Sequence, residues 1–454
     1  MPITFDLNKE VYLLFSNQSL KKLLIPLVIE QILSIMVGIT DTIMVSSAGE
    51  AAVSGVALAD MIDYFVITVL AAVATGGAVI VSQYIGRGQK DKAKESAGQL
   101  LLISVIISIG IMVLCLLFRY SLLQVLFGRV EDNVMRSAMI YFSITACSFP
   151  FLGIYNASAA LFRSMGKTNM TMYVSLFMNI VNIIGDFIGV QIFHAGVAGV
   201  AVPTLISRAL SAIIMTVLAF NRNYLIFLCF KNIFTWKQDL LQKIMRIAVP
   251  GGIENGLFAL GRVLVTSIVS LFGTEQIAAN GVANSIDQIA VMVVNAVNLA
   301  MITVVGQCIG AGLPDDAQNY TKKLMKVSYV STALLGGIVC ILLPLILQFY
   351  HLSGETLRYA AILIVMHNIL AFVLHPTSFN LANSLRASGD ASFTMFVGIG
   401  SMVLFRLGSA VFFGIVLHFG IIGVWIAMGM DWLARSIAFC YRYKSGKWRT
   451  MKSI

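Results

Sequence analysis

Residues 178–190 read MNIVNIIGDFIGV, an apolar stretch that nevertheless contains three polar side chains. These are Asn179, Asn182 and Asp186, which are spaced three and four residues apart, so on an α-helix they share one face. A polar group inside a lipid bilayer costs free energy unless another group satisfies it. The stretch therefore predicts a membrane helix whose polar face is turned toward other helices.

The composition of the whole chain predicts an integral membrane protein. Of its 454 residues, 58% are hydrophobic and only 11% are charged, and the mean hydropathy is +0.89. Soluble proteins carry about a quarter charged residues, whereas the apolar runs here exceed the ~20 residues that a spanning helix needs. The first residues, MPITFDLNKEVYLLFSN, lack a cleavable signal pattern, so we expect the first span to remain in the mature protein.

The apolar runs predict an all-α protein with twelve membrane-spanning helices. Lysine and arginine gather at the ends of alternate spans, and the intervening loops hold few basic residues, among them Arg119, Arg129, Arg136 and Arg358. This asymmetry predicts a multi-pass protein of the inner (plasma) membrane with both termini in the cytoplasm. It also explains the net charge of +10 without nucleic acid. We expect spans at residues 23–46, 53–81, 97–118, 139–162, 170–193, 197–220, 247–272, 277–304, 325–349, 359–384, 393–417 and 421–442.

Reactive side chains show no pattern of an enzyme or a metal centre. The six cysteines lie in or beside apolar runs and have neither disulfide nor metal-ligand spacing. The five histidines have no metal spacing either, and no nucleophile–base arrangement is visible. We therefore expect no catalytic residue and no cofactor.

The chain repeats itself at an offset of 224 residues. IPLVIEQ from Ile25 matches VPGGIEN from Val249, and SQYIGRGQKDKA (82–93) matches GQCIGAGLPDDA (306–317). After a one-residue slip RSMGKTNMTM (163–172) matches RASGDASFTM (386–395), and then Gly196 and Gly199 match Gly420 and Gly423 at 224 again. Each repeat has six spans, so both enter the membrane in the same direction and a pseudo-twofold axis along the membrane normal relates them. The expected parts are an N-terminal six-helix lobe (1–221), a cytoplasmic linker (222–246) and a C-terminal six-helix lobe (247–454).

These features resemble one known family. The two six-helix lobes, TDTIMVSSAG (40–49), NIVNIIGD (179–186), the paired glycine-containing loops and GVWIAMGMDWLAR (423–435) are similar to the multidrug and toxic compound extrusion (MATE) transporters. The resemblance covers essentially the whole chain. It implies a monomeric secondary active exporter that exchanges amphipathic organic cations for Na⁺ or H⁺ by alternating access across the bilayer.

Four polar residues are candidates for the coupling site. Counted at about 1.5 Å per helical residue, Asp41, Asp186 and Thr204 fall in the outer half of the N-terminal lobe, where they can meet Asn182. Two carboxylates brought together need a shared proton or a bound cation, and an all-oxygen set suits a hard cation such as Na⁺. MATE proteins have a cation or proton site of this kind in this lobe, which implies these four residues as its ligands.

Two further asparagines, Asn156 and Asn179, are expected to support this set from outside. The alternative is that some of these groups only join helices, which is worth about 0.6 kcal/mol each in membranes. That alternative suits Asn179 or Thr204 better than either aspartate, because a carboxylate costs about 2.5–3.5 kcal/mol at mid-helix.

A second set of candidates is centred on Glu30 and Glu254, which each follow a proline by four residues. Proline bends a spanning helix, so the pair predicts a hinge near the cavity, where a carboxylate could attract a cationic substrate or carry a proton. The alternative is a structural acid bonded within its own lobe. Some MATE proteins place their ion site around a carboxylate of the seventh helix, so Glu254, with Arg262 and Asp287 near it, is the alternative coupling site.

Other charged residues have simpler interpretations. Asp431 and Arg435 are one turn apart and are expected to pair, with Arg406 able to join them. Asp60 and Asp63 are expected to be solvated at the outer end of the second span.

Two other functions remain open. Related flippases suggest export of a lipid-linked precursor, which several inward-facing arginines would favour; the candidates are Arg208, Arg262 and Arg406. An intramembrane enzyme is disfavoured by the repeat over most of the chain.

Overall fold

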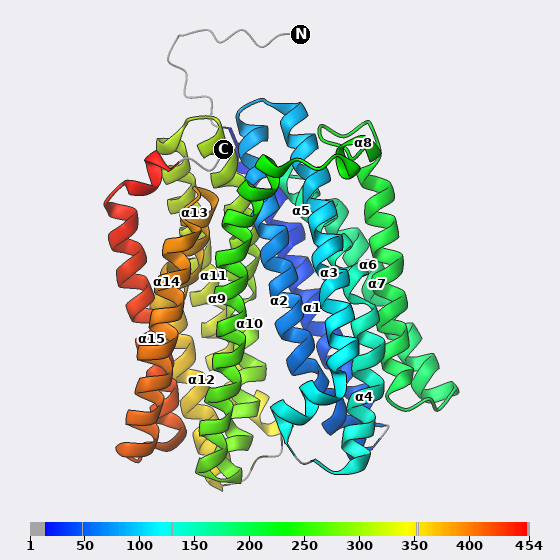
Figure 1. Ribbon diagram of the computed structural model, residues 1–454. Coiled ribbons are helices and arrows are strands. Elements are labelled where there is room, and N and C mark those ends of the chain that lie inside the picture. Colours follow the sequence, from blue (N-terminus) through cyan, green and yellow to red (C-terminus); the bar gives the residue numbers. More distant parts are fainter. Residues whose placement is uncertain (1–13, 48, 129, 351, 353, 452–454) are drawn as a thin grey trace.

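The computed structural model describes residues 14–47, 49–128, 130–350, 352 and 354–451, so Arg129 lies outside the described residues. All regular structure in these ranges is helical, and α1 begins at the same end of the molecule at which α15 ends (Figure 1). Among the described residues, eleven helices are long and apolar enough to cross a membrane, or twelve if one bent pair counts as a single span. Large side chains such as Leu117, Ile341 and Phe396 are exposed, as a lipid-facing surface requires. The chain is a multi-pass membrane protein.

The N-terminal half contains seven helices, and each predicted span lies within them to one residue. The helices are longer than the apolar runs because several polar turns at their ends remain helical. One span is bent by 44° between α4 and α5, where Pro150 is at the start of α5 and supplies no backbone N–H. The bounds are α1 (Asn17–Ser46), α2 (Glu50–Gly86), α3 (Lys90–Phe127), α4 (Asp132–Cys147), α5 (Phe149–Ser164), α6 (Thr168–Phe187) with the π-helical η1 (Ile188–Ile192), and α7 (Ala198–Ala219).

The C-terminal half repeats this order with more π-helical segments. Such segments often occur at functional sites, and here they interrupt the tenth and eleventh spans. Pro250 lies inside an unbroken α9 as Pro26 lies inside α1. The bounds are α9 (Gln238–Val269), η2 (Ser270–Phe272), α10 (Thr274–Gly310), α11 (Pro314–Phe349), α12 (Gly354–His375), η3 (Pro376–Asn380), α13 (Leu381–Ala387), α14 (Ala391–Ser401), η4 (Met402–Gly408), η5 (Ala410–Val416), α15 (Gly420–Lys444) and η6 (Lys447–Thr450).

The connection between the halves is shorter than the predicted linker 222–246. Its last nine residues belong to α9, which begins at Gln238, because a polar helix end outside the bilayer has no apolar signal. The remaining segment contains α8 (Phe230–Phe234) and is held against α3 by Gln99. The Gln99 amide donates to Asn232 O at 2.8 Å and Thr235 O at 2.7 Å, and its Oε1 accepts from Lys237 N at 3.0 Å.

The two halves come into backbone contact near the end at which α1 begins and α15 ends. A Cβ on Gly86 would lie 1.9 Å from Gln307 O, and a Cβ on Gly310 would lie 2.0 Å from Gln83 O, so α2 and α10 cross there backbone to backbone. Gln83 Nε2 also donates to Ala387 O at 2.8 Å, and Gln307 Nε2 donates to Ser164 O at 2.7 Å. Each contact from one half thus has its counterpart from the other half.

Candidate ion-coupling and substrate site

Three helices of the N-terminal half bring the four predicted coupling residues together. Asp41 comes from α1, Asn182 and Asp186 come from one face of α6, and Thr204 comes from α7. Asn182 connects Asp186 and Thr204, because its Nδ2 donates to Asp186 Oδ1 at 3.3 Å and to Thr204 Oγ1 at 3.2 Å. The spacing that places Asn182 one turn before Asp186 therefore serves to orient the carboxylate.

The carboxyl groups of Asp41 and Asp186 lie close enough for each to influence the charge of the other. One oxygen of each, Oδ1 of Asp41 and Oδ2 of Asp186, is buried without a hydrogen-bond partner among the described residues. Burial leaves these oxygens without water, so the pair needs a shared proton or a cation to be stable. Arg208 of α7 contributes a positive charge that acts on Asp41 and also on Asp63 of α2.

Asp41, Asn182 and Thr204 line a cavity of about 300 Å³ between α1, α5, α6 and α7, whereas Asp186 is buried outside its lining. Its wall includes Asp41, Asn179, Asn182 and Thr204 but not Asn156. Asn179 is buried and its Nδ2 has no hydrogen-bond partner in the described structure, so it is available to a bound group. The donor set combines carboxylate, amide and hydroxyl oxygens, which fits Na⁺ or a proton.

Asn156 lies apart from the cavity that Asp41, Asn182 and Thr204 line. This residue lines a different cavity of about 80 Å³ between the halves, together with Thr75, Arg163 and Thr303. Asn156 follows the bend between α4 and α5, and the bend changes the direction in which the later turns of this span face.

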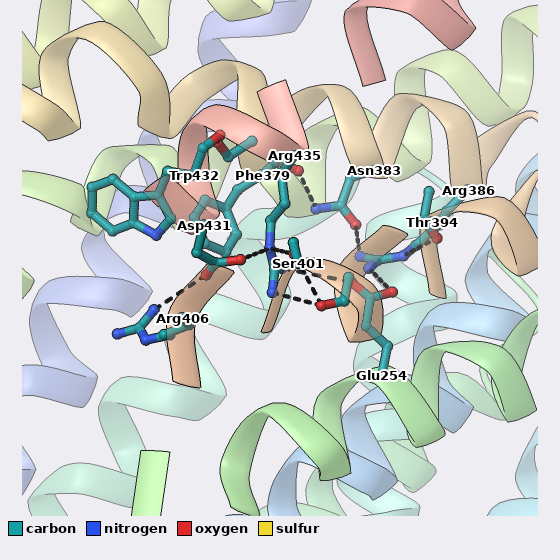
Figure 2. Close-up of polar contacts among 12 residues, drawn as sticks. Glu254, Phe379, Asn383, Arg386, Thr394, Ser401, Arg406, Asp431, Trp432 and Arg435 are labelled. Carbon is teal, nitrogen blue, oxygen red and sulfur yellow. Dashed lines mark hydrogen bonds and ion pairs between the residues drawn. The ribbon is translucent and has the colours of Figure 1, made fainter. Parts of the chain in front are cut away.

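Glu30 is bonded within its own half of the chain. Its carboxylate accepts a hydrogen bond from Arg163 Nη2 at 2.8 Å and another from Thr171 Oγ1, both within the N-terminal half. The repeat-related Glu254 accepts from Arg386 Nη2 at 2.6 Å and lies 4.0 Å from Arg435 Nη1 (Figure 2). Both glutamates line cavities, so each pair borders the space between helices.

The structure does not bring Arg262 and Asp287 to Glu254. Asp287 instead lies 3.1 Å from His367 Nδ1 on α12, and both side chains are buried. Arg262 Nη1 donates to the hydroxyl of Tyr64 on α2 at 3.5 Å. Arg262 lies eight residues after Glu254 on α9, about 12 Å along the helix, and Asp287 faces α12. The three residues therefore do not form one cluster.

Two further predictions have opposite outcomes. Asp431 and Arg435 pair at 2.9 Å, and Arg406 reaches Asp431 at 3.5 Å, as predicted. Asp63, in contrast, is buried rather than solvated, whereas Asp60 is exposed. The pair of Asp287 and His367 was missed; the match of Asp63 with Asp287 across the repeat is the one signal that could have indicated burial of both.

Comparisons with known proteins agree with this architecture. The MatE family model matches residues 26–188 and again 250–412. The chain is 29% identical to the "uncharacterized transporter YisQ" of Bacillus subtilis, over 95% of this chain and 94% of that protein. It is 24% identical to the "probable multidrug resistance protein NorM" of Thermotoga maritima, over 95% and 93% of the two chains.

The fold also matches a solved structure, an outward-facing conformation of a multidrug resistance MATE family transporter. The TM-score is 0.88 at 18% identity, over 95% of this chain and 96% of the other. MATE proteins are transporters and not enzymes. Because the family model matches the chain twice and covers most of its length, the chain belongs to the MatE family, the MATE transporters.

Proposed function

We propose that this protein is a secondary active exporter that exchanges an amphipathic organic cation for Na⁺ or H⁺. The observation that supports this function is the pair Asp41 and Asp186, whose buried oxygens lack donors. Such a pair binds a cation or a proton in place of the missing donors. The relatives named as multidrug resistance proteins support the substrate class.

The two halves act as two six-helix lobes related by a pseudo-twofold axis along the membrane normal. The offset between the two family matches and the reciprocal contacts of Gln83 and Gln307 support this arrangement. Alternating access then consists of rocking one lobe against the other about the central cavity. The lobes are residues 1–221 and 247–454, the protein acts as a monomer, and both termini lie in the cytoplasm.

Coupling acts through α1. The half of this helix that carries Asp41 has poorly covered apolar residues, since Met36 is 53%, Ile39 57% and Ile43 60% exposed. A proton or Na⁺ at Asp41 and Asp186 removes the repulsion between the carboxylates and changes how α1 packs on α6. The ion therefore shifts the equilibrium between conformations by its different affinity for each of them.

The test is efflux of a cationic dye from proteoliposomes under an imposed Na⁺ gradient and, separately, an imposed pH gradient. Asp41→Asn and Asp186→Asn are each expected to abolish gradient-driven efflux, while Asp132→Asn, an exposed carboxylate at the start of α4, leaves it unchanged. The gradient that drives efflux in the unaltered protein names the ion. Efflux that survives both Asp41→Asn and Asp186→Asn would exclude this mechanism.

Export of a lipid-linked precursor is a second candidate, and one observation favours it. A cavity of about 490 Å³ between α2, α3 and α9 is lined by apolar residues such as Phe65, Val69 and Leu257, and it could hold an acyl or isoprenyl chain. Movement of a fluorescent polyisoprenyl phosphate across proteoliposomes, with no efflux of the dye, would establish this function instead.

A further inference from the structure

The connection between the two halves has an unusual composition for a segment between spans. Residues 220–237 read FNRNYLIFLCFKNIFTWK and follow α7, which ends at Ala219. The segment is rich in aromatic rings, contains three basic residues (Arg222, Lys231 and Lys237) and has no acidic residue. Apolar rings are unfavourable in water, so this composition is not that of a linker surrounded by solvent.

The most exposed rings of the connection lie on and just after α8. Phe230 is 69%, Phe234 75% and Trp236 60% exposed; these three side chains are called the aromatic patch below. The rings of Phe230 and Phe234 are nearly parallel, with centres 6.5 Å apart. Phe230 also contacts the ring of Phe220 at 4.8 Å. Because Phe220 follows α7 directly, the patch continues from the end of that helix.

The opposite face of the connection is packed against α3, which gives the patch a fixed position. Gln99 bonds the backbone of the segment three times. A Cβ on Gly98 would lie 2.7 Å from the carbonyl of Asn232, so the backbones of α3 and α8 are in close contact. The side chains of Ile226 and Leu228 are buried. The exposed rings are therefore presented on a held surface and are not free to fold inward.

Two of the three basic side chains are available to an anion. Lys237 pairs with Glu95 of α3. Arg222 and Lys231 are exposed, and neither is paired with a carboxylate among the described residues. Lysine and arginine both bind phosphate groups through charge-assisted hydrogen bonds. A lipid headgroup places such a phosphate directly beside apolar chains, which matches cations that lie next to exposed rings.

The position of the connection agrees with the surface of a bilayer. α8 lies at the end of the molecule at which α1 begins (Figure 1). α7 ends and α3 begins at this same end. Aromatic rings are typical of the level at which apolar spans meet headgroups, and basic residues beside a span attract anionic lipid.

We propose that the connection 220–237 binds the surface of the bilayer, with the aromatic patch among the acyl chains and with Arg222 and Lys231 on the phosphates of anionic lipids. Lipid is favoured over a protein partner because the patch continues from a membrane helix and because its unpaired charges are all positive. The inference goes beyond the proposed function and depends on neither the coupling ion nor the substrate. Since the connection joins the two halves, its anchoring holds the joining segment at one level of the membrane.

Trp236 is a built-in probe for this contact. It is exposed, whereas Trp425, Trp432 and Trp448 are buried. Fluorescence quenching of the full-length protein is measured in nanodiscs that contain equal mole fractions of spin-labelled phosphatidylglycerol or spin-labelled phosphatidylcholine, and the signal of Trp236→Phe is subtracted. A label near the headgroup is expected to quench Trp236 more than a label at the chain end. Phosphatidylglycerol is expected to quench it more than phosphatidylcholine.

Substitutions separate the charged contact from the apolar one. Arg222→Gln and Lys231→Gln are each expected to lower the preference for phosphatidylglycerol about fivefold and to leave quenching by phosphatidylcholine unchanged. Phe234→Ser is expected to reduce quenching by both lipids. Lys90→Gln is the matched control, because Lys90 is an exposed lysine at the start of α3 and lies outside the connection.

Three results would overturn the inference. The first is quenching of Trp236 by aqueous acrylamide with none by either lipid. The second is equal quenching by the two lipids that Arg222→Gln and Lys231→Gln leave unchanged, because the surface would then bind no anion. The third is protection of Trp236 from acrylamide and from both lipids only when two copies share a nanodisc, which would show that a second copy of the chain covers the patch.

Discussion

Gly86 and Gly310 are expected to control the population in which the two halves are separated at the end where α1 begins and α15 ends. Each glycine lies where α2 and α10 cross, and each would place a Cβ about 2 Å from the backbone of the other helix, at 1.9 Å from Gln307 O and 2.0 Å from Gln83 O. Ordinary contact begins at 3.4 Å. An alanine at either position therefore forces the helices apart by roughly 1.5 Å, the difference between these distances.

The cost applies mainly to the conformation in which the helices touch. Overpacking of this kind costs about 1–3 kcal/mol, and the added methyl group meets no obstacle once the halves have separated. The equilibrium between closed and separated arrangements is then expected to shift about 5- to 150-fold toward separation, because each 1.4 kcal/mol is tenfold. The double variant is expected to match either single variant, since one separation relieves both contacts.

Double electron–electron resonance, which measures the distance between two spin labels, reports this shift in population. Labels at Lys92→Cys and Lys322→Cys, both exposed near that end, in a background without the six native cysteines, give the population of the two distances. Gly281→Ala is the matched control, because Gly281 lies on the same helix α10 with nothing within 4 Å of its Cβ.

Two results would refute this reasoning. The first is an unchanged distance distribution in both Gly86→Ala and Gly310→Ala. The second is a double variant whose shift is the sum of the two single shifts, because independent contacts would not be relieved by one movement.

Three other outcomes follow from the same contacts. Glu30→Gln leaves Arg163 unpaired at a partly buried site and is expected to lower the free energy of unfolding by up to about 3–5 kcal/mol. The double variant with Arg163→Gln is expected to lose less stability, and thermal unfolding in detergent compares the two. If Na⁺ is the coupling ion, raising its concentration from zero to 100 times its Kd is expected to raise the free energy of unfolding by about 2.7 kcal/mol. Titrations of the melting temperature with Na⁺ measure this effect, and Asp41→Asn is expected to abolish it. Gln99→Ala removes three hydrogen bonds to the connection 220–237 and is expected to speed cleavage of this connection by trypsin. An unchanged cleavage rate would contradict the prediction.

The helices and the coupling cluster could be predicted because both depend on position along a helix. Apolar runs longer than the bilayer thickness identify spans, and a rise of about 1.5 Å per residue places Asp41, Asp186 and Thr204 at compatible depths. Asn182 then joins Asp186 to Thr204 by hydrogen bonds, and Asp41 lines the same cavity as Asn182 and Thr204.

The partners of several residues could not be predicted because they depend on rotation about the helix axis. One residue changes the direction of a side chain by about 100°, and packing against neighbours decides which direction is buried. Asp287 thus faces His367 rather than Glu254, and Asn156 faces the other half rather than the coupling site. The helical start of α9 was missed for a related reason, since helix ends outside the bilayer carry no apolar pattern.

The repeat explains why the two halves share a frame and differ in chemistry. Backbone contacts such as those of Gly86 and Gly310 require the same small residue in both halves, because neither helix can move aside while the halves touch. The cavities impose no such requirement, since a side chain that faces open space can change without disturbing the packing. Asp41 in one half therefore corresponds to Val265 in the other, so the repeat does not duplicate this carboxylate. A transporter built in this way can keep one frame for both lobes while a single lobe carries the carboxylates proposed for coupling.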